Sequence, residues 1–290
     1  MNILLTGATG FIGGNVATAL TQSGHRVVPA SRRTGLDFLR MTAVADWLPH
    51  LHGIKAVINC VGIIGETRQQ RFAALHRDAP IALFQACAKA NVRRVIQISA
   101  LGADDSAFSA YHLSKRAADQ ALRALDLDWC VLRPSLTYGR GGTSNDLFLR
   151  LARLPVLPLI GDGQQTVQPV HIADVVVTVL RGLQTKVVRQ SLDIVGNESL
   201  SFADWLSRMR AAQGLPPARR LHVPPRLAQA AFQMLRHVHP LFQPDNLRML
   251  LAGYHADSAA ITAFLGRPPL PFSPSLFFAD AREACSWTTC

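Results

Sequence analysis

The sequence lacks several features that would assign the chain to a simple class. No stretch of 18 or more apolar residues occurs among its 290 residues, so a membrane-spanning helix is not expected. Charged residues make up only 17% against 49% apolar, a balance that excludes an intrinsically disordered chain. A Gly-x-Ser-x-Gly segment is also missing, which excludes a serine hydrolase with a nucleophile elbow. The length suits one large domain or two closely associated ones.

Cysteine is scarce and unpatterned. The chain has 5 cysteines, an odd number, and none forms a Cys-x-x-Cys pair. Cys60 and Cys130 fall in apolar, strand-like runs, where reduced thiols behave as small hydrophobic residues. The N-terminus has no positively charged segment of the kind that opens a signal peptide. These features predict a protein of a reducing compartment, the cytoplasm.

Basic charge exceeds acidic charge, with 30 Lys and Arg against 19 Asp and Glu and a net charge of +11. No basic run is longer than two residues and no nucleic-acid-binding motif occurs, so no nucleic acid partner is predicted. Two histidine pairs, His50 with His52 and His237 with His239, have a spacing that does not share a helical face. No cysteine or acid completes a ligand set near them, and we predict no metal site.

Strand-like and helix-like segments alternate over the first 140 residues. Several of the strand-like segments are continuously apolar, as expected for strands that are buried on both faces of a sheet. This alternation predicts an α/β fold, a doubly wound parallel sheet of the Rossmann type. The expected strands are 2–5, 26–30, 56–60, 95–99 and 129–133, and the expected helices 11–23, 43–51, 69–91 and 111–125.

The regular alternation ends after Arg133, where turn-forming residues become frequent. We expect residues 1–196 to form an NAD(P)-binding Rossmann domain, with a lobe-forming insertion at about 140–165. Residues 197–290 contain several short helix-like segments broken by proline. They are expected to form a smaller, mostly helical substrate-binding lobe that makes one wall of a cleft.

Three glycines follow the first expected strand directly and open the first expected helix. Gly7, Gly10 and Gly13 have the spacing Gly-x-x-Gly-x-x-Gly. Gly7 permits a tight turn, Gly10 lets the backbone approach a pyrophosphate, and Gly13 allows close packing of helix and strand. The start of the helix then offers free N–H groups and a positive dipole end to phosphate oxygens. A dinucleotide site is predicted here.

The segment after the second expected strand indicates which dinucleotide binds. NAD usually meets an Asp or Glu about 20 residues after the glycine loop, at its ribose 2′-hydroxyl. Residues 27–35 contain no acid and offer Ser31, Arg32 and Arg33 instead. Guanidinium groups form strong charge-assisted hydrogen bonds with a 2′-phosphate. We therefore expect NADP(H) to be preferred over NAD(H).

A tyrosine and a lysine are placed four residues apart on an expected helix, and hence on one face of it. They are Tyr111 and Lys115, in a chain with only 3 tyrosines. An ammonium group stabilises a nearby phenolate, which prepares the tyrosine for proton transfer to a carbonyl oxygen or from an alcohol. Because burial raises the pKa of a phenol, the cations must outweigh burial for Tyr111 to act as a base. Lys115 is also suited to hold the nicotinamide ribose.

Taken together, these motifs resemble the extended or atypical short-chain dehydrogenase/reductase family. The resemblance is greatest to bacterial relatives of the NADPH-binding accessory subunit of respiratory complex I. It covers about residues 1–200 and includes five further segments, namely Asn59–Gly62, Ser99–Ala103, Leu132–Ser135, Tyr138–Gly139 and Val170–Asp174.

The resemblance implies a role for each matching residue. Those expected to contact the pyrophosphate are Gly7, Thr9, Gly10, Phe11, Ile12 and Gly13. Arg32 and Arg33, with Ser31, would face the 2′-phosphate. The residues expected near the adenine, its ribose and the nicotinamide are Asp37, Phe38, Val61, Gly62 and Pro134. Tyr111 and Lys115 would be catalytic, together with Ser99.

Two departures from the family pattern leave a second hypothesis open. Ser99 stands one place early, with Ala100 at the position of the family's catalytic Ser or Thr, and the family's helix Asn is replaced near Asp78. The chain is therefore either an NADP(H)-dependent oxidoreductase or a non-catalytic NADPH-binding scaffold or sensor of a respiratory or membrane complex. The expected partner is a small-molecule, lipophilic substrate such as a quinone, with the protein a monomer or homodimer.

One further segment is amphipathic. Within residues 226–239, five apolar residues share a helical face, namely Leu227, Ala231, Met234, Leu235 and Val238. Such a helix either packs over the substrate cleft or lies on a membrane or partner surface. The second alternative would place the protein at the inner face of a membrane.

Overall fold

The computed structural model describes residues 1–236, 238 and 240–287, with the side chains described as far as Ala284. The histidine pair at 237 and 239 and the cysteines at 285 and 290 lie outside the described side chains. The chain forms two compact units. The first contains Met1–Pro134 and Val176–Asp193, and the second contains Ser135–Val175 and the chain from Ile194 onward. The division expected at residue 196 concerns cofactor and substrate binding and stays a prediction.

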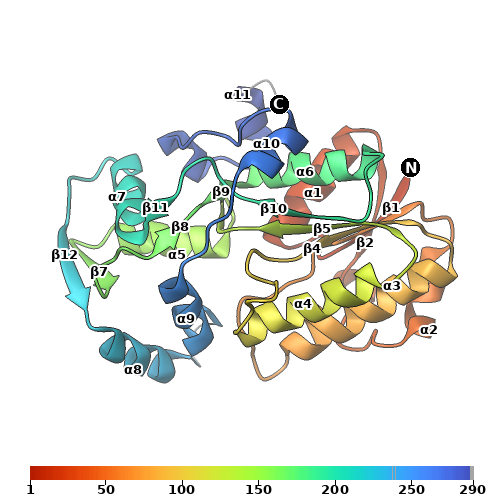
Figure 1. The fold of residues 1–290 in the computed structure, drawn as a ribbon, viewed down its shortest axis with the longest axis horizontal. Helices are drawn as coiled ribbons and strands as arrows, with labels where there is room; N and C mark the ends of the chain where they lie inside the picture. The colour runs from red at the N-terminus through yellow and green to blue at the C-terminus, as the bar shows by residue number, and fades with distance from the viewer. Residues whose placement is uncertain (237, 239, 288–290) are drawn as a thin grey trace. The chain divides into compact units, whose positions relative to one another are not determined.

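A six-stranded sheet organises the first unit, in the order β10-β5-β4-β3-β1-β2 (Figure 1). β1 pairs in parallel with β2 and β3, β3 with β4, and β4 with β5. The strands are β1 (Asn2–Thr6), β2 (Arg26–Ala30), β3 (Ala56–Asn59), β4 (Arg94–Ile98), β5 (Asp128–Pro134) and β10 (Gln190–Ile194). The predicted doubly wound parallel α/β fold is confirmed. The strand order reverses between β1 and β3, the position at which such sheets bind ligands.

Helices cover both faces of this sheet. Figure 1 shows α3 (Ala79–Lys89) and α4 (Ala110–Arg123) on one face, and α1 (Phe11–Gln22) and α6 (Ile172–Gln184) on the other. Successive strand residues point to opposite faces, which divides the core in two. The face toward α3 and α4 is filled by a cluster that includes Leu4, Val57, Val95, Leu83 and Leu122. The central residues of these strands are mostly apolar on both sides of the sheet, as expected where helices bury both faces.

The expected long helix at 69–91 is divided in the structure. A π-helix, η3 (Ala73–Asp78), precedes α3, and the short α2 (Val44–Trp47) continues into a 3-10 helix, η2 (Leu48–Leu51). A further 3-10 helix, η1 (Arg32–Thr34), follows β2. Residues 67–71 form no helix, and side chains bond the amides of this region: Thr67 accepts from Gln70 N–H, and Glu66 from Phe72 N–H at 2.8 Å.

The second unit combines helices with three two-stranded sheets. β6 pairs in parallel with β9, β7 with β12, and β8 is antiparallel to β11. Its strands are β6 (Thr137–Tyr138), β7 (Val156–Ile160), β8 (Thr166–Val167), β9 (Val170–His171), β11 (Leu200–Ser201) and β12 (Arg219–Val223). Its helices are α5 (Thr143–Ala152), α7 (Phe202–Ala212), α8 (Pro225–Leu235), η4 (Pro240–Phe242), α9 (Pro244–Ala252), α10 (Ala259–Leu265), η5 (Pro274–Phe278) and α11 (Ala281–Trp287). Over the described part of the chain, no helix is long and apolar enough to cross a membrane.

An aromatic cluster forms the core of the second unit. Trp205 lies within 5.0–5.4 Å, ring centre to ring centre, of Tyr138, Phe272 and Phe277. Two polar residues of the resemblance hold neighbouring segments in the same unit. His171 bonds to Leu276 O at 3.1 Å, and Asp174 pairs with Arg267 at 2.8 Å and accepts from Leu270 N–H. Both therefore anchor the segment 267–276 within the second unit.

Candidate cofactor and proton-transfer site

The glycine loop connects β1 to α1 and is shaped by close backbone contacts. Gly7 has a φ of +67°, and a Cβ built there would lie 2.7 Å from the carbonyl carbon of Cys60. A Cβ on Gly13 would lie 2.1 Å from Gly7 O, and one on Gly10 3.3 Å from the same oxygen. No other residue type fits at Gly7 and Gly13 without displacing the backbone. Gly7 and Gly13 therefore have the tight-turn and close-packing roles predicted for them, and the role of Gly10 toward a pyrophosphate stays a prediction.

The N-terminus of α1 presents backbone N–H groups next to this loop. Gly10 is the N-cap, and no described side chain caps the helix or places an acid in its first turn. Phe11 and Ile12 are partly exposed, while Thr9 and Gly10 are exposed. A helix end of this kind binds phosphate oxygens through its amides and its dipole. The loop thus offers backbone N–H donors of the kind that bind a pyrophosphate.

The residues predicted to face a 2′-phosphate lie at the carboxyl end of β2. Ser31 is the N-cap of η1, and its N–H donates to Thr34 Oγ1 at 3.0 Å. Arg32 and Arg33 are exposed, and neither makes an ion pair with any residue that the structure describes. Both guanidinium groups are therefore available to a phosphate, at the same sheet edge as the glycine loop.

The two residues expected near the adenine differ in exposure. Asp37 is partly buried and accepts a hydrogen bond from Leu39 N–H at 3.2 Å. Phe38 is only 5% exposed and packs edge-on against Trp47, with ring centres 5.0 Å apart. Most of the Phe38 side chain therefore belongs to the core, and little of it is left to contact a ligand.

Lys115 lies on the buried face of α4 and reaches the ends of two strands. Its Nζ donates to Val61 O at 3.0 Å and to Ile98 O at 3.1 Å. A Cβ on Gly62 would lie 3.2 Å from this Nζ, so the glycine keeps the approach to the ammonium group open. Two of the three ammonium protons are used by these carbonyls. One remains for a ligand such as a ribose hydroxyl.

Tyr111 precedes Lys115 by one helical turn and packs among aromatic rings. Its ring centre lies 5.9 Å from that of Phe72 and 5.5 Å from that of His76. Within the described part of the chain its hydroxyl has no hydrogen-bond partner. Burial raises the pKa of Tyr111 to about 12, and the charge of Asp119 adds to the effect. Among the described groups, burial thus has a larger effect on the pKa of Tyr111 than the nearby cations. The condition stated above for Tyr111 to act as a base is not met.

Ser99 is turned toward a carboxylate that the sequence analysis did not consider. Its Oγ donates to Asp119 Oδ2 at 2.5 Å, and both side chains are almost fully buried. Burial raises the pKa of Asp119 to about 6, opposed by the Ser99 hydrogen bond and by Lys115. Burial also lowers the pKa of Lys115 to about 8, opposed by Asp119. Ser99 therefore joins a buried pair on α4, and Ala100, which follows it, is apolar and 7% exposed.

His76, two residues before Asp78, lies beside Tyr111 and close to Lys115. Asp78 itself is 40% exposed and pairs with Arg77 at 2.7 Å. His76 is 1% exposed, and its Nε2 accepts from Ile63 N–H at 2.9 Å. Its Nδ1 lies 3.0 Å from Ser114 Oγ, which donates in turn to Tyr111 O.

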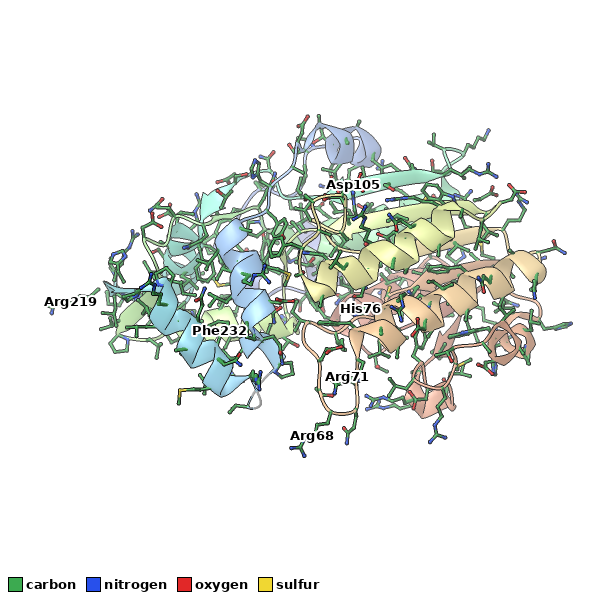
Figure 2. The ribbon with its side chains drawn as sticks, turned by 60° about the horizontal axis from the view of Figure 1, so that its bottom comes forward. Arg68, Arg71, His76, Asp105, Arg219 and Phe232 are labelled. Atoms are coloured by element: carbon green, nitrogen blue, oxygen red, sulfur yellow. The ribbon has the colours of Figure 1, made fainter. Side chains whose placement is uncertain are left out.

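This hydrogen-bond chain assigns a neutral imidazole with its proton on Nδ1. Burial and the nearby Lys115 both lower the pKa of His76, which keeps the ring neutral. Figure 2 shows His76 between α4 and the start of α3. The ring connects the segment after β3, which carries Gly62, to the helix that carries Tyr111. A lone histidine within a helical pattern gave no sequence signal for this role.

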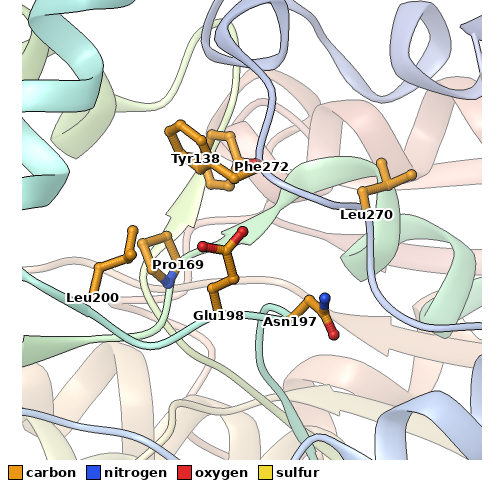
Figure 3. Close-up of a pocket in the computed structure, with 7 residues that line it drawn as sticks. All are labelled: Tyr138, Pro169, Asn197, Glu198, Leu200, Leu270 and Phe272. Carbon is orange, nitrogen blue, oxygen red and sulfur yellow. The ribbon is translucent and has the colours of Figure 1, made fainter.

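Pro134 ends β5, is buried, and accepts from Leu101 N–H at 3.0 Å. The second unit contains a small pocket of its own, lined by Tyr138, Pro169, Asn197, Glu198, Leu200, Leu270 and Phe272 (Figure 3). None of its lining residues was singled out from the sequence as a ligand contact. Among the residues that the structure describes, no group of three or more His, Cys, Asp or Glu is placed to hold a metal ion.

Comparison with known families identifies the family of the chain. The profile of the NAD dependent epimerase/dehydratase family matches residues 3–194, from β1 to the end of β10. The chain belongs to this family. Its members are NAD(P)-dependent enzymes with a Rossmann fold, so the oxidoreductase class predicted from the motifs is confirmed at that level. The preference between NAD and NADP stays a prediction.

Two curated relatives match this chain over part of their own length. Ceramide reductase of Caulobacter vibrioides is 31% identical over 198 residues, which cover 64% of this chain and 62% of the relative. NADH dehydrogenase (ubiquinone) 1 alpha subcomplex subunit 9, mitochondrial, of Mus musculus is 29% identical over 186 residues. That match covers 58% of this chain and 49% of the relative. The chain thus spans about half to three fifths of these relatives.

Solved structures extend the likeness of the fold over the whole chain. MoeE5 in complex with UDP-glucuronic acid and NAD has a TM-score of 0.73 and 23% identity, covering 99% of this chain and 100% of that chain. UDP-glucuronic acid 4-epimerase from Bacillus cereus in complex with NAD has a TM-score of 0.74 and 20% identity, covering 99% of each chain. At these identities the likeness shows the fold alone.

Proposed function

We propose that this epimerase/dehydratase family member is an NADP(H)-dependent oxidoreductase that reduces a carbonyl carbon of a small, lipophilic substrate. The observation that carries the proposal is the joint arrangement of Tyr111 and Lys115 on α4, at the sheet edge that also holds the glycine loop. When bound, the dinucleotide supplies a hydride. The exposed pair Arg32 and Arg33, with no acid at the end of β2, supports a 2′-phosphorylated cofactor.

Each residue of the site then has a physical task. The amides of the first turn of α1 hold the pyrophosphate, and the third proton of Lys115 holds a ribose hydroxyl. The Oη of Tyr111 donates its proton to the carbonyl oxygen as negative charge develops there. His76 and Ser114 act by positioning, because they fix the helix that carries Tyr111 against the segment that carries Gly62.

The raised pKa of Tyr111 keeps its hydroxyl protonated, the state that proton donation requires. A phenol with a pKa of about 12 is protonated throughout the physiological range and is therefore ready to act as an acid. As a base for alcohol oxidation, the same group would need its pKa lowered by several units. The reduced nicotinamide ring carries no positive charge that would lower it. The name of the Caulobacter relative, ceramide reductase, is in keeping with reduction and with a lipophilic substrate.

The replacement Tyr111→Phe tests the catalytic assignment. Because the ring packing is kept and only the hydroxyl is lost, NADPH affinity should stay within about threefold while turnover falls by about 100-fold or more. Tyr254→Phe, in the second unit, is the control and should retain turnover. Turnover by Tyr111→Phe at the wild-type rate would reject the assignment.

A second candidate function is a non-catalytic NADPH-binding scaffold or sensor. It is favoured by the Ser99 hydroxyl, which donates its proton to Asp119 instead of offering it to a substrate. The relationship to a subunit of NADH dehydrogenase is also in keeping with it. On this hypothesis NADPH binds and stabilises the fold, yet no carbonyl or quinone is reduced. Consumption of NADPH at a rate that depends on Tyr111 would decide for the enzyme.

The remaining parts of the proposal concern location and assembly. We keep a cytoplasmic location at the inner face of a membrane, and a monomer or homodimer, as proposals that follow from the sequence. Light scattering of the purified chain measures its mass and decides the second point.

A further inference from the structure

Helix α8 in the second unit leaves most of its apolar surface uncovered. Only Ala228 of this helix is buried. Ala228 and the partly buried Phe232 belong to the side that packs toward α9 and η4, with the Phe232 and Phe242 ring centres 5.4 Å apart. Figure 2 shows Phe232 on this helix. The packed side is therefore a narrow part of the apolar arc.

The remaining apolar residues form one continuous stripe. Leu227, Ala231 and Met234 follow one another at intervals of three or four residues, which places them along one side of α8, and Val238 lies in the turn after the helix ends at Leu235. Leu227 is 62% exposed, Met234 79% and Val238 74%. We call these four residues the α8 stripe. Two large apolar side chains exposed in a row on α8, with a third in the turn that follows, differ from the scattered apolar residues of an ordinary surface.

The surroundings of the α8 stripe are basic. Residues 205–244 contain six arginines and no Asp or Glu. Arg219 on β12 and Arg226 at the start of α8 are exposed, and neither pairs with an acid in the part of the chain that the structure describes. The polar side of α8 carries Arg226, Gln229 and Gln233. A row of apolar side chains bordered by arginines fits a surface that has an apolar interior and an anionic outer layer.

We propose that the α8 stripe docks on an anionic lipid bilayer, with its apolar residues in the acyl boundary and the arginines among the phosphates. A second copy of this chain fits less well, because a symmetric contact would bring two arginine-rich, acid-free segments together. The surface does not depend on the chemistry of the proposed cofactor site. Its natural consequence is access to substrates that reside in the membrane.

Flotation of the full chain with lipid vesicles tests the docking. Binding is expected to vesicles of phosphatidylcholine with phosphatidylglycerol, to be much weaker to phosphatidylcholine alone, and to weaken as salt is raised. The double replacement Leu227→Glu with Met234→Glu should lower the partition coefficient by about tenfold or more, because it places charges in the apolar contact. Arg219→Gln and Arg226→Gln should each lower it about fivefold.

The matched control is Val187→Glu, at a residue of the first unit that is 63% exposed. It should bind vesicles as the wild type does. All these positions are exposed, so the free energy of unfolding should change little. Turnover of a water-soluble carbonyl compound should also be unchanged in the Leu227→Glu, Met234→Glu protein. A failure of the docking is thereby distinguished from a failure of the proposed function.

Three outcomes would overturn the docking. The first is no binding to anionic vesicles. The second is vesicle binding that the α8 replacements leave unchanged. The third is a dimer in solution that Met234→Glu dissociates, in a protein that does not bind vesicles. The α8 stripe would then be assigned to contact with a second copy of the chain. Capture of an acidic protein by the wild type, without vesicle binding, likewise counts against the lipid surface.

Discussion

Two neighbouring glycines of α1 should respond in opposite ways to the same substitution. Gly13→Ala places a Cβ 2.1 Å from Gly7 O, so we expect it to lower the free energy of unfolding by about 3 kcal/mol. Gly14→Ala meets only Ala8 O at 3.6 Å, and alanine should raise the free energy of unfolding by about 0.5–1 kcal/mol. Urea denaturation followed by circular dichroism measures both. Equal effects would show that the close packing of loop and helix is not what requires Gly13.

Arg32 provides a residue-scale test of the cofactor preference. Removal of its guanidinium in Arg32→Ala should weaken NADPH binding by about 10- to 100-fold, which corresponds to a charged hydrogen bond of about 1.5–3 kcal/mol. NADH, which lacks the 2′-phosphate, should bind as before. Arg68→Ala, at another exposed arginine of the same unit (Figure 2), is the control for lost charge. A wild-type protein that prefers NADH would contradict the preference.

The buried pair Lys115 and Asp119 predicts how turnover depends on pH. Because burial lowers the pKa of Lys115 to about 8, turnover should fall as the pH rises through that value and the ammonium group is lost. The Asp119 carboxylate raises the pKa of Lys115, so Asp119→Asn should move this alkaline fall to lower pH. Profiles of kcat/KM against pH measure the shift. Asp105→Asn, at a side chain that is 98% exposed, should leave the profile in place.

At the residue scale, the sequence predicted those site residues whose separation along the chain matches a turn or a helical turn. Gly7, Gly10 and Gly13, and the pair of Tyr111 with Lys115, are separated by distances that a turn or a helix fixes locally. Asp119 was missed because its partner Ser99 is 20 residues away, on another element. Its position one turn beyond Lys115 on the buried face of α4 was the signal that could have found it.

Among the elements, the π-helix η3 departs most from the sequence prediction. The periodicity of 69–91 predicts one long α-helix. A π-helix, with its i→i+5 hydrogen bonds, is too rare to be expected from an apolar pattern. In the structure η3 holds His76 against Ile63 N–H and Ser114. The π-helix η3 thus positions His76, a role that no local sequence pattern predicts. The start of α4, by contrast, follows from Ser109, whose side chain accepts from His112 N–H at 3.1 Å.

Replacement of His76 should separate the two elements that it connects. His76→Leu leaves Ile63 N–H and Ser114 without their partner, so we expect the free energy of unfolding to fall by about 1–3 kcal/mol. Because His76 acts by positioning, kcat should fall more than NADPH affinity, and His76→Gln should restore part of kcat through its amide. Arg77→Ala, next in the chain with an exposed side chain, is the control. A fall in NADPH affinity equal to the fall in kcat would indicate a general loss of structure instead.

At the scale of the whole molecule, the two units do not simply follow one another along the sequence, because each is built from two separate segments. The chain leaves the first unit after Pro134 and returns at Val176. The returning segment adds β10 beside β5, where Arg133 pairs with Asp193 at 2.6 Å. The sequence predicted the fold class and the strands because each strand is a separate apolar run. It predicted a lobe-forming insertion at about 140–165 without the full extent of the segment, 135–175, because that extent depends on packing between segments far apart in the chain.

Every residue of the proposed cofactor site belongs to the first unit, so the cofactor should stabilise that unit as a whole. A ligand that binds only the folded state adds about 2.7 kcal/mol to the free energy of unfolding at 100 times its Kd. NADPH at that ratio should therefore move the urea midpoint upward, and the same concentration of NADH should move it less. Arg32→Ala should reduce the NADPH shift toward that of NADH, because the 2′-phosphate then keeps only the Arg33 guanidinium as a charged partner. Equal shifts from both nucleotides in the wild type would mean that the arginines at the end of β2 do not select the cofactor.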